Sequence, residues 1–414
     1  MAIESPQARG VDQKGADRRR DPPQGNMQRF CLDPTRLQHK VVHEDDRAEG
    51  DKNIFAEEQP DVIGRRRHRA QAVPYIARQR AKALFRRPLR HRRQQRAHHL
   101  RMSAEAGQPQ SGGGFAHKQI DDQQTSGGRA RFCAQHNDRL VLICPGRIES
   151  YVKYAEVAYD LFHCGFDVMI IDHRGQGRSG RLLSDTHRGH VVNFSDYVDD
   201  LAALWQQQVV PGHWRKRFIL AHSMGGAIAT LFLQRYRAHC DAIALCAPMF
   251  GIIIRLPDWM VRHILDWAEG HQRIREEYAI GTGRWRALPF AVNVLTHSRQ
   301  RYRRNLRFYA DEPRLQVGGP TWHWVREGML AGDEVLANVE KDTAPTLLLQ
   351  AEEERVVDNL MHDRYCELRA DAGHPCEGGK PLVIEGAYHE ILFEKDAMRS
   401  VALNAIVEFF NRHT

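Results

Sequence analysis

The stretch Arg217-Phe-Ile-Leu-Ala-His-Ser223-Met-Gly-Gly-Ala227 decides the fold of this chain. Its apolar run, Phe218 to Ala221, predicts a buried strand, and the run from Ala227 to Tyr236 predicts a helix. Ser223 lies at the sharp turn between the two, an arrangement called a nucleophile elbow. Glycine at 225 and 226 leaves room where strand and helix nearly touch. Ser223 is therefore a candidate nucleophile, while the simpler interpretation is a serine that only ends a strand.

Apolar runs and helical patterns alternate along the chain on both sides of this turn. Such alternation predicts a mostly parallel sheet with helices on both faces, which is an α/β fold. A continuous apolar run indicates a strand that is buried on both faces. The runs that predict strands are 140–144, 166–172, 218–221, 242–247, 345–350 and 381–384.

Between residues 251 and 332 the alternation stops, and this insertion is predicted to form a helical cap over Ser223. An apolar stretch, 252–267, has helical spacing, and an arginine-rich segment, 299–307, follows it. One interpretation is that the apolar face packs on the core and that the arginines are solvated. The other is that the cap admits an acyl chain and that its arginines contact lipid phosphate. The sequence leaves both open.

The net charge of +8 belongs to the front of the chain. Residues 1–100 hold 23 Lys and Arg against 13 Asp and Glu, whereas the remainder holds 37 against 39. Few apolar residues and no hydrophobic period over 1–130 predict disorder in this N-terminal third. Three interpretations are open. The segment is a basic arm that binds nucleic acid or anionic lipid, an extension without a role, or a segment that is not normally made because the start codon has been assigned too early. No aromatic interleaving supports nucleic-acid binding, so none is expected.

The cysteines and the apolar runs indicate the compartment. The eight cysteines form no C-x-x-C pair, and Cys144 and Cys246 lie inside apolar runs. Buried free thiols in a reducing compartment are expected, with neither a disulfide framework nor a zinc site. No apolar run is long enough to span a membrane, and the first ten residues lack the apolar core of a signal peptide. We therefore expect a cytoplasmic protein that holds no metal.

Gly175-Gln-Gly177-Arg-Ser-Gly180 follows a predicted strand and fits the dinucleotide-binding pattern G-x-G-x-x-G. That function needs a helix that opens on the glycines, so that its N-terminus holds the pyrophosphate. The next ten residues, 181–190, are polar and lack a helical period, and the next predicted helix begins near Ser195. A turn is the favoured interpretation, and no cofactor is expected.

A serine hydroxyl needs a neighbouring base that a carboxylate orients. In α/β-hydrolases these residues follow in the order serine, acid, histidine, each on a loop after a strand. His389 follows the last predicted strand, and an acid in the 352–358 segment precedes it. The backbone N–H groups of Met224 and Arg147 are the natural donors for an oxyanion.

Several long motifs carry a resemblance to a known family. From about Arg131 to Thr414, the chain resembles the monoacylglycerol-lipase-like α/β-hydrolases, and among them the lysophospholipases of Gram-negative bacteria. The resemblance implies hydrolysis of the acyl ester of lysophospholipids and peripheral attachment to the inner membrane. The motifs are Cys144-Pro-Gly-Arg-Ile-Glu-Ser-Tyr-Val-Lys-Tyr-Ala155, Ile171-Asp-His-Arg-Gly-Gln-Gly-Arg-Ser179, Ala221-His-Ser-Met-Gly-Gly226, Gly281-Thr-Gly-Arg-Trp-Arg-Ala-Leu-Pro-Phe290, Gln350-Ala-Glu-Glu-Glu-Arg-Val-Val-Asp-Asn359 and Gly386-Ala-Tyr-His-Glu390.

The chain departs from the family pattern in three places. The acid is an Asp before an Arg in the wider family, and here that position is Glu354, so Asp358 stays as the alternative acid. The family's His-Gly ahead of the oxyanion donor is Pro145-Gly146 here, which keeps a backbone donor. Residues 1–130 do not recognisably supply the strands that family members have ahead of the first motif.

We therefore predict a serine carboxylester hydrolase of the α/β-hydrolase fold, with Ser223, Glu354 and His389 as its catalytic residues. Its substrate is predicted to be a lysophospholipid at an anionic membrane surface, in the cytoplasm or peripheral on the inner membrane. A monoacylglycerol lipase or esterase, a lysophospholipid acyltransferase and a non-enzymatic binding protein that uses its basic arm remain as alternatives. The predicted parts are a basic extension (1–130), the first part of the hydrolase core (131–250), the cap (251–335) and the second part of the core (336–414).

Overall fold

The computed structural model describes residues 129–132, 137–254 and 256–414. Residues 1–128 of the basic extension, with their predicted disorder and any role as a basic arm, lie outside the described residues, whereas Arg129 and Ala130 belong to a strand. Cys31 and Cys133 lie outside the described residues as well. The six cysteines that the structure does describe are free thiols, and five of them are buried.

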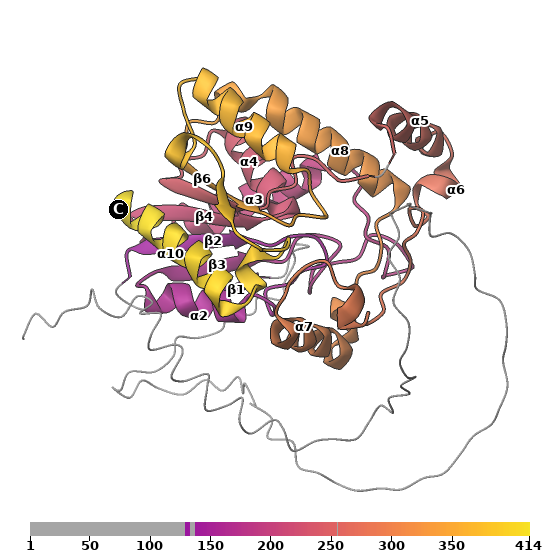
Figure 1. The fold of residues 1–414 in the computed structure, drawn as a ribbon, viewed down its shortest axis with the longest axis horizontal. Helices are drawn as coiled ribbons and strands as arrows, with labels where there is room; N and C mark the ends of the chain where they lie inside the picture. The colour runs from indigo at the N-terminus through magenta and orange to yellow at the C-terminus, as the bar shows by residue number, and fades with distance from the viewer. Residues whose placement is uncertain (1–128, 133–136, 255) are drawn as a thin grey trace, which may run out of the picture. The chain divides into compact units, whose positions relative to one another are not determined.

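One sheet of seven strands forms the centre of the described chain, in the order β1-β3-β2-β4-β5-β6-β7 (Figure 1). β1 runs antiparallel to β3, and the other strands are parallel to one another. Every predicted strand is present, and most are buried along their length because helices cover both faces of the sheet. The strands are β1 (Arg129–Phe132), β2 (Arg139–Cys144), β3 (Asp167–Ile171), β4 (Lys216–His222), β5 (Ala242–Cys246), β6 (Thr346–Ala351) and β7 (Leu382–Ile384).

The sequence did not predict β1. This strand pairs with β3 from Arg129 opposite Ile171 to Phe132 opposite Val168. The predicted start of the core at residue 131 therefore falls inside a strand that forms the edge of the sheet. An edge strand is defined by its hydrogen bonds to the neighbouring strand more than by burial. The sequence Arg-Ala-Arg-Phe therefore lacks the apolar run from which the other strands were predicted.

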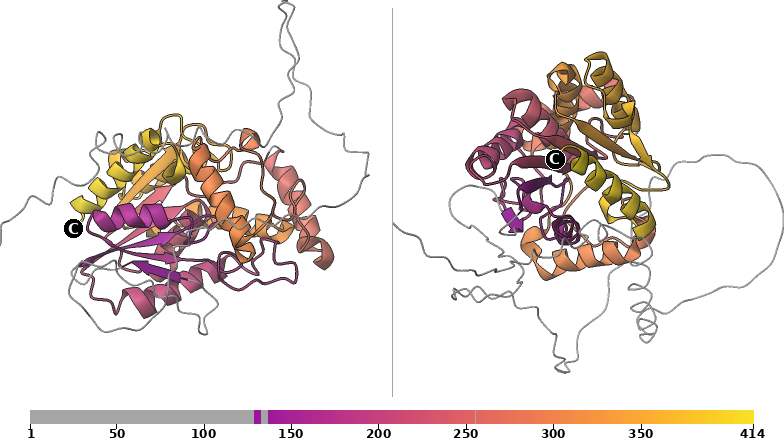
Figure 2. Two further views of the ribbon diagram at one scale, coloured as in Figure 1. Left: turned by 90° about the horizontal axis from the view of Figure 1, so that it is seen from below. Right: turned by 90° about the vertical axis from the view of Figure 1, so that its left-hand side faces the viewer.

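Helices cover both faces of the sheet, as expected for an α/β-hydrolase (Figures 1 and 2). α2 (Ala155–His163) and α10 (Asp396–Arg412) lie on one face. α3 (Ser195–Leu204), α4 (Met224–Tyr236) and α9 (Asn359–Asp371) lie on the other. α3 continues into a π-helical turn, Trp205–Val209, so the helical segment that was predicted to begin near Ser195 ends at Val209.

The insertion after β5 forms helices at the end of the sheet where the parallel strands finish (Figure 2). α8 then returns to the core and packs on α4, so the predicted cap boundary at 335 lies inside this helix. The elements are α5 (Asp258–Glu269), α6 (Gln272–Arg275), α7 (Arg299–Asp311) and α8 (Trp322–Ala337), with short 3₁₀ turns at Phe290–Val292, Pro313–Leu315 and Val339–Lys341. Two further 3₁₀ turns, Glu377–Gly379 and Ile391–Phe393, flank β7.

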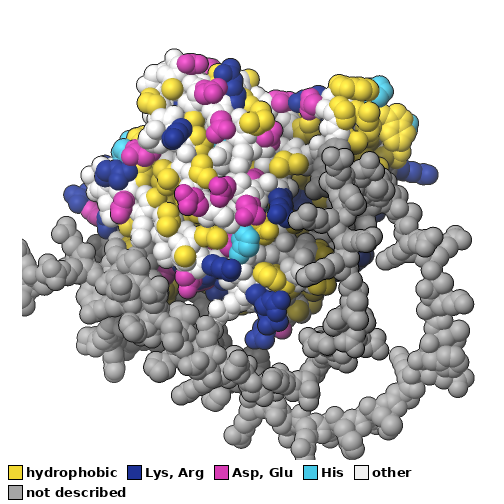
Figure 3. Space-filling view, viewed as in Figure 1, with side chains coloured by type: hydrophobic (Ala, Val, Ile, Leu, Met, Phe, Trp, Pro, Cys, Tyr) yellow, Lys and Arg dark blue, Asp and Glu magenta, His cyan; other side chains and the backbone are white. Residues whose placement is uncertain are grey.

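The apolar face of α5 is divided between the interior and the surface. Val261 and Leu265 are buried, whereas the side chains of Trp259 and Trp267 are 70% and 53% exposed. Figure 3 shows hydrophobic side chains gathered over α5. Packing on the core therefore explains only part of the predicted apolar stretch.

α4 begins three residues before the predicted start at Ala227, with Gly225 and Gly226 in its first turn. Because glycine is unfavourable in a helix, the predicted start of this helix was too late. The structure shows what the glycines provide, because a Cβ on Gly225 would overlap the carbonyl oxygens of Cys144 and Pro145. Close approach of the helix to the end of β2 thus outweighs helix propensity.

We expect Gly225→Ala to lower the free energy of unfolding by about 1–3 kcal/mol, the usual cost of forcing an extra carbon into a packed site. Thermal unfolding of the purified variant measures the effect. Gly180→Ala is the matched control, because a Cβ at Gly180 meets no atom within 4 Å. Equal melting temperatures for the two variants would contradict the assigned contact.

Candidate active site

Ser223 occupies the turn between β4 and α4 with φ 51° and ψ −122°. Positive φ is uncommon for a residue other than glycine and persists only where the surroundings hold it. The Ser223 N–H donates to Cys246 O at 3.1 Å, and the Ser223 carbonyl accepts from the N–H groups of Gly226 and Met249 at 2.8 and 2.9 Å. The elbow is therefore fixed from both sides by β5 and the segment after it.

The structure brings the three predicted catalytic side chains into one chain of contacts. Ser223 Oγ lies 2.9 Å from Nε2 of His389. Nδ1 of the same imidazole lies 2.8 Å from Oε2 of Glu354. The side chains of His389 and Glu354 are only 5% and 2% exposed. Since the three residues follow β4, β7 and β6, they meet at the carboxyl ends of parallel strands.

Glu354 is held by its own loop. Its Oε1 accepts backbone N–H groups from Arg355 and Val356 at 2.8 Å and from Val357 at 3.3 Å. Burial raises the pKa of Glu354, but the contact with His389 and the backbone N–H groups outweigh burial, so the pKa lies below its ordinary value. The carboxylate is therefore ionised where it orients the imidazole.

The alternative acid, Asp358, has a different place. Its carboxylate is the N-cap of α9 and accepts the Leu360 N–H at 2.9 Å. Asp and Asn are preferred at this position because they satisfy a free N–H group of the first helical turn. Of the two predicted acids, Glu354 is the one whose carboxylate contacts His389.

The two predicted oxyanion donors flank Ser223. Met224 is the first residue of α4, where a backbone N–H has no partner within the helix. Arg147 lies on the loop after β2, next to Gly146, and a Cβ built on Gly146 would lie 3.1 Å from the Cβ of Ser223. Both N–H groups are thus on segments that border the serine.

Gln176 secures the loop that carries Arg147. Its amide nitrogen donates to the carbonyls of Gly146 and Glu149 at 2.7 and 2.9 Å. Its amide oxygen accepts the Ile148 N–H at 3.2 Å, and Tyr309 of α7 donates to the Ile148 carbonyl at 2.7 Å. Gln176 belongs to the G-x-G-x-x-G segment, which is a turn, as predicted. The sequence singled out the segment but not this contact.

A buried cluster of charges lies behind the site. Glu149 accepts the Gly146 N–H at 2.5 Å, Lys153 Nζ at 2.6 Å and the hydroxyl of Tyr154 at 2.6 Å. Lys153 also contacts Glu390 at 2.6 Å. Burial raises the pKa of Glu149, but Lys153 and the neighbouring imidazole of His222 hold the pKa well below its usual range.

His222 connects this cluster to His389, the candidate catalytic histidine. Its Nδ1 lies 3.1 Å from Glu149 Oε2, and its Nε2 lies 3.2 Å from the His389 carbonyl. Burial disfavours a charged imidazole, but Glu149 raises the pKa of His222 above its ordinary value. His222 precedes Ser223 in the chain, and this adjacency is the signal that sequence reasoning passed over.

A cavity of about 420 Å³ opens beside Ser223 and His389. Both the core and the cap line it, and a mostly apolar wall of this size suits an apolar ligand with a few polar contacts. Its apolar lining includes Ile148, Met249, Ile252, Trp285, Leu288, Leu295, Leu306, Trp324, Val325, Val356 and Val357.

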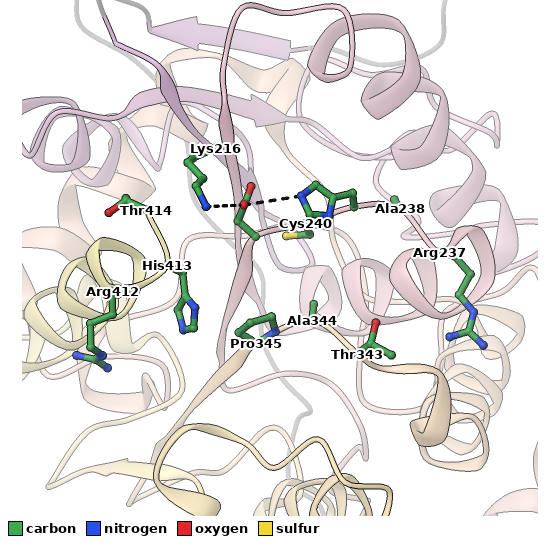
Figure 4. Close-up of a pocket in the computed structure, with 12 residues that line it drawn as sticks. Lys216, Arg237, Ala238, Cys240, Thr343, Ala344, Pro345, Arg412, His413 and Thr414 are labelled. Carbon is green, nitrogen blue, oxygen red and sulfur yellow. Dashed lines mark hydrogen bonds and ion pairs between the residues drawn. The ribbon is translucent and has the colours of Figure 1, made fainter.

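A second depression, of about 560 Å³, lies where the parallel strands begin (Figure 4). Its wall carries Lys216 and His239, which both pair with Asp241. Cys240 is the cysteine among the described residues that line this depression. Its thiol is buried and donates to the Ala242 carbonyl, and burial raises the pKa of the thiol. A buried thiol with a raised pKa is unreactive, and ligands of open α/β sheets bind at the carboxyl ends of the strands, not at the amino ends. This depression is therefore not a candidate active site.

Within the described ranges, no group of three or more His, Cys, Asp or Glu is placed to hold a metal ion.

The fold and the site together define a serine hydrolase of the α/β-hydrolase class. The family model described as Serine aminopeptidase, S33 matches residues 135–396. Lysophospholipase L2 of Escherichia coli (strain K12) is 78% identical over 283 residues, which cover 68% of this chain and 83% of the relative. The probable lysophospholipase L2 of Haemophilus influenzae is 34% identical over 276 residues, 66% of this chain and 84% of the relative. The chain belongs to the lysophospholipase L2 family.

Solved structures agree on the fold. A soluble variant of monoglyceride lipase from Saccharomyces cerevisiae, in complex with a substrate analogue, matches with a TM-score of 0.53 and 15% identity, covering 72% of this chain and 96% of that one. The monoacylglycerol lipase of Paleococcus ferrophilus matches with a TM-score of 0.52 and 20% identity, covering 69% and 98%. These likenesses support the α/β-hydrolase fold and nothing finer.

We expect Glu354→Gln to lower kcat by about a hundred- to ten-thousand-fold, because a neutral amide no longer stabilises the imidazolium that forms during reaction. Asp358→Asn is the matched control, since it removes one carboxylate from the same loop but keeps a good N-cap. Steady-state hydrolysis of a soluble ester measures both variants. If Asp358→Asn shows the larger loss, the acid has been assigned to the wrong residue.

Proposed function

We propose that this protein is a serine carboxylester hydrolase that releases the fatty acid from lysophospholipids. The observation that carries the proposal is the contact chain from Ser223 through His389 to Glu354 at one end of a largely apolar cavity. The high identity to the Escherichia coli lysophospholipase L2 supports the substrate class. An apolar wall of core and cap residues suits the acyl chain.

The mechanism follows from the positions of the side chains. Ser223 Oγ attacks the ester carbonyl carbon while His389 Nε2 takes the hydroxyl proton, and Glu354 stabilises the charged imidazole. The N–H groups of Met224 and Arg147 donate to the oxygen on which negative charge develops. The C–O bond to glycerol breaks, and His389 returns its proton to the leaving alkoxide. Water then cleaves the acyl-enzyme by the same route, which releases the fatty acid and restores Ser223.

Peripheral contact of the cap with an anionic membrane surface, on the cytoplasmic side of the inner membrane, is part of the proposal. Exposed tryptophans beside arginines suit the boundary between water and lipid, where aromatic rings and cations are both accommodated. Trp259 and Trp267 project from α5, and Ile280, which is 83% exposed, follows α6. Among the helices that the structure describes, none is both long and apolar enough to cross a bilayer.

Ser223→Ala is expected to abolish release of fatty acid from lysophosphatidylethanolamine, because the hydroxyl that forms the acyl-enzyme is gone. Labelling with a fluorophosphonate, followed by peptide mapping, is expected to mark Ser223 in the wild type and no residue in the variant. Unchanged thermal unfolding of the variant serves as the control for folding. Persistent hydrolysis by a folded Ser223→Ala protein would refute the mechanism.

Comparison of substrates separates the related activities. Wild-type rates on lysophospholipid and on a monoacylglycerol of the same acyl chain distinguish a lysophospholipase from a monoacylglycerol lipase. Addition of an acceptor lipid reveals an acyltransferase, since the acyl chain then appears on the acceptor instead of as free fatty acid.

Trp259→Ser combined with Trp267→Ser is expected to weaken binding to anionic phospholipid vesicles at least about fivefold, because burial of each indole contributes favourable transfer free energy. Co-sedimentation with vesicles of phosphatidylethanolamine and phosphatidylglycerol measures it. Val401→Ser, at a 54% exposed position on α10, is the control. Equal binding of vesicles by the double variant and the control would contradict the proposed contact between the cap and the membrane.

A further inference from the structure

The side chain of Arg147 is a half-buried cation without a carboxylate partner in the described part of the chain. It lines the cavity that also holds Ser223 and His389. Its Nη2 donates to the Gly318 carbonyl at 2.6 Å, and its guanidinium lies 5.0 Å from the ring centroid of Trp324. Its Nε is buried and has no hydrogen-bond partner among the described residues. Burial lowers the pKa of Arg147 to about 10, so the group is still charged at neutral pH.

The other charged groups of the cavity wall that are buried contact one another. Lys153 bridges Glu149 and Glu390, and His222 contacts Glu149 at 3.1 Å. An unpaired buried charge costs several kcal/mol in a protein. This cost is expected to be retained only where the charge has a use, and a cavity beside a nucleophile is such a place.

Three arginines of the cap are engaged in ion pairs elsewhere. Arg284 pairs with Asp185 at 2.8 Å. Arg301 and Arg304 both pair with Glu156, at 2.6 and 2.7 Å. Arg286 lines the cavity but is exposed. The cation that is half-buried in the cavity wall, and that has no carboxylate partner among the described residues, is therefore on the oxyanion loop, whereas Arg286 of the cap is exposed.

The surroundings of Arg147 form a narrow slot for the guanidinium. A Cβ on Gly189 would lie 2.7 Å from Arg147 Nη2, so the glycine leaves room for the guanidinium beside the backbone. The Gly189 segment is tied to the segment that accepts from Arg147, because the Gly189 N–H donates to the Gly319 carbonyl at 3.0 Å. Trp324 closes another side of the slot. The guanidinium is thus held in place before any ligand arrives.

We propose that the Arg147 guanidinium binds the phosphate of the lysophospholipid head group and so selects phosphate-bearing acyl glycerols over neutral ones. This inference rests on the proposed lysophospholipase function. A phosphodiester carries a single negative charge and free oxygens, and the planar guanidinium fork matches them with charge-assisted hydrogen bonds. Binding also gives this half-buried cation a counter-charge that no carboxylate among the described residues supplies.

The lengths of ligand and side chain agree with this assignment. The ester oxygen of a 1-acyl lysophospholipid is separated from phosphorus by the glycerol carbons and one further oxygen. An arginine side chain separates Cα from the guanidinium carbon by the same number of single bonds. The Arg147 N–H is proposed to face the carbonyl oxygen of the ester, one carbon away from the bridging oxygen, so the arginine side chain is similar in length to the glycerol segment that leads to the phosphate.

The test uses the full chain and two substrates with the same acyl chain, 1-acyl lysophosphatidylethanolamine and 1-monoacylglycerol, in micelles of a neutral detergent. The readout is the ratio of kcat/KM for the two, which cancels any general damage to the site. Arg147→Gln is expected to lower the ratio of lysophospholipid to monoacylglycerol by about ten- to hundred-fold, the range for a lost charge-assisted contact. Arg147→Lys is expected to retain part of the preference for lysophospholipid, because lysine keeps the positive charge but lacks the planar, forked donors of the guanidinium.

Arg262→Gln is the control, because Arg262 pairs with Asp258 and Asp333 on the exposed cap and should leave the ratio unchanged. A second measurement needs no variant: methylation of the phosphodiester to a neutral triester should lower wild-type kcat/KM by the same factor. An unchanged ratio in Arg147→Gln, or equal wild-type rates on diester and triester, overturns the phosphate site and leaves the proposed function standing. A wild type that hydrolyses only monoacylglycerol overturns both.

Discussion

The close approach of the turn after β4 to the end of β2 is the constraint on which the site depends. Ser223 adopts a positive φ, and Gly225 packs against the carbonyl oxygens of Cys144 and Pro145. Because the helix starts this close to the neighbouring strand, the serine hydroxyl and the loop that carries Arg147 lie side by side. Nucleophile and proposed oxyanion donors are then parts of one packed unit, and preorganised donors of this kind are most effective because they need not rearrange during reaction.

The features of the fold that could be predicted are those that depend on local sequence patterns. Continuous apolar runs marked β2 through β7, and the turn residues around Ser223 marked the elbow. β1 was missed because an edge strand with sequence Arg-Ala-Arg-Phe is defined by its pairing with β3, which no local pattern records. The start of α4 was placed too late because helix propensity counts glycine as unfavourable, whereas backbone contact with a neighbouring strand requires it at Gly225.

The candidate site divides in the same way. The order of Ser223, Glu354 and His389 along the chain was readable, since each follows a predicted strand. The choice between Glu354 and Asp358 was not, because both lie on one loop and only the loop's conformation decides which carboxylate turns toward the imidazole. Gln176 and His222 were missed for a related reason. Each acts through contacts with residues that are distant in the chain, and neither the turn segment of Gln176 nor the place of His222 beside Ser223 reveals those contacts.

The pairing of buried charges gives the cavity its electrostatic character. Glu149, Lys153, His222 and Glu390 contact one another, and this cluster holds the backbone around Ser223. Arg147 is the exception, and in a site of low dielectric its field is strong. Its backbone and its side chain belong to one loop that Gln176 and Tyr309 fix. The spacing between the proposed oxyanion position and the proposed phosphate position is therefore set by the chain itself, so that a head group bound at one end brings the ester at the other to Ser223.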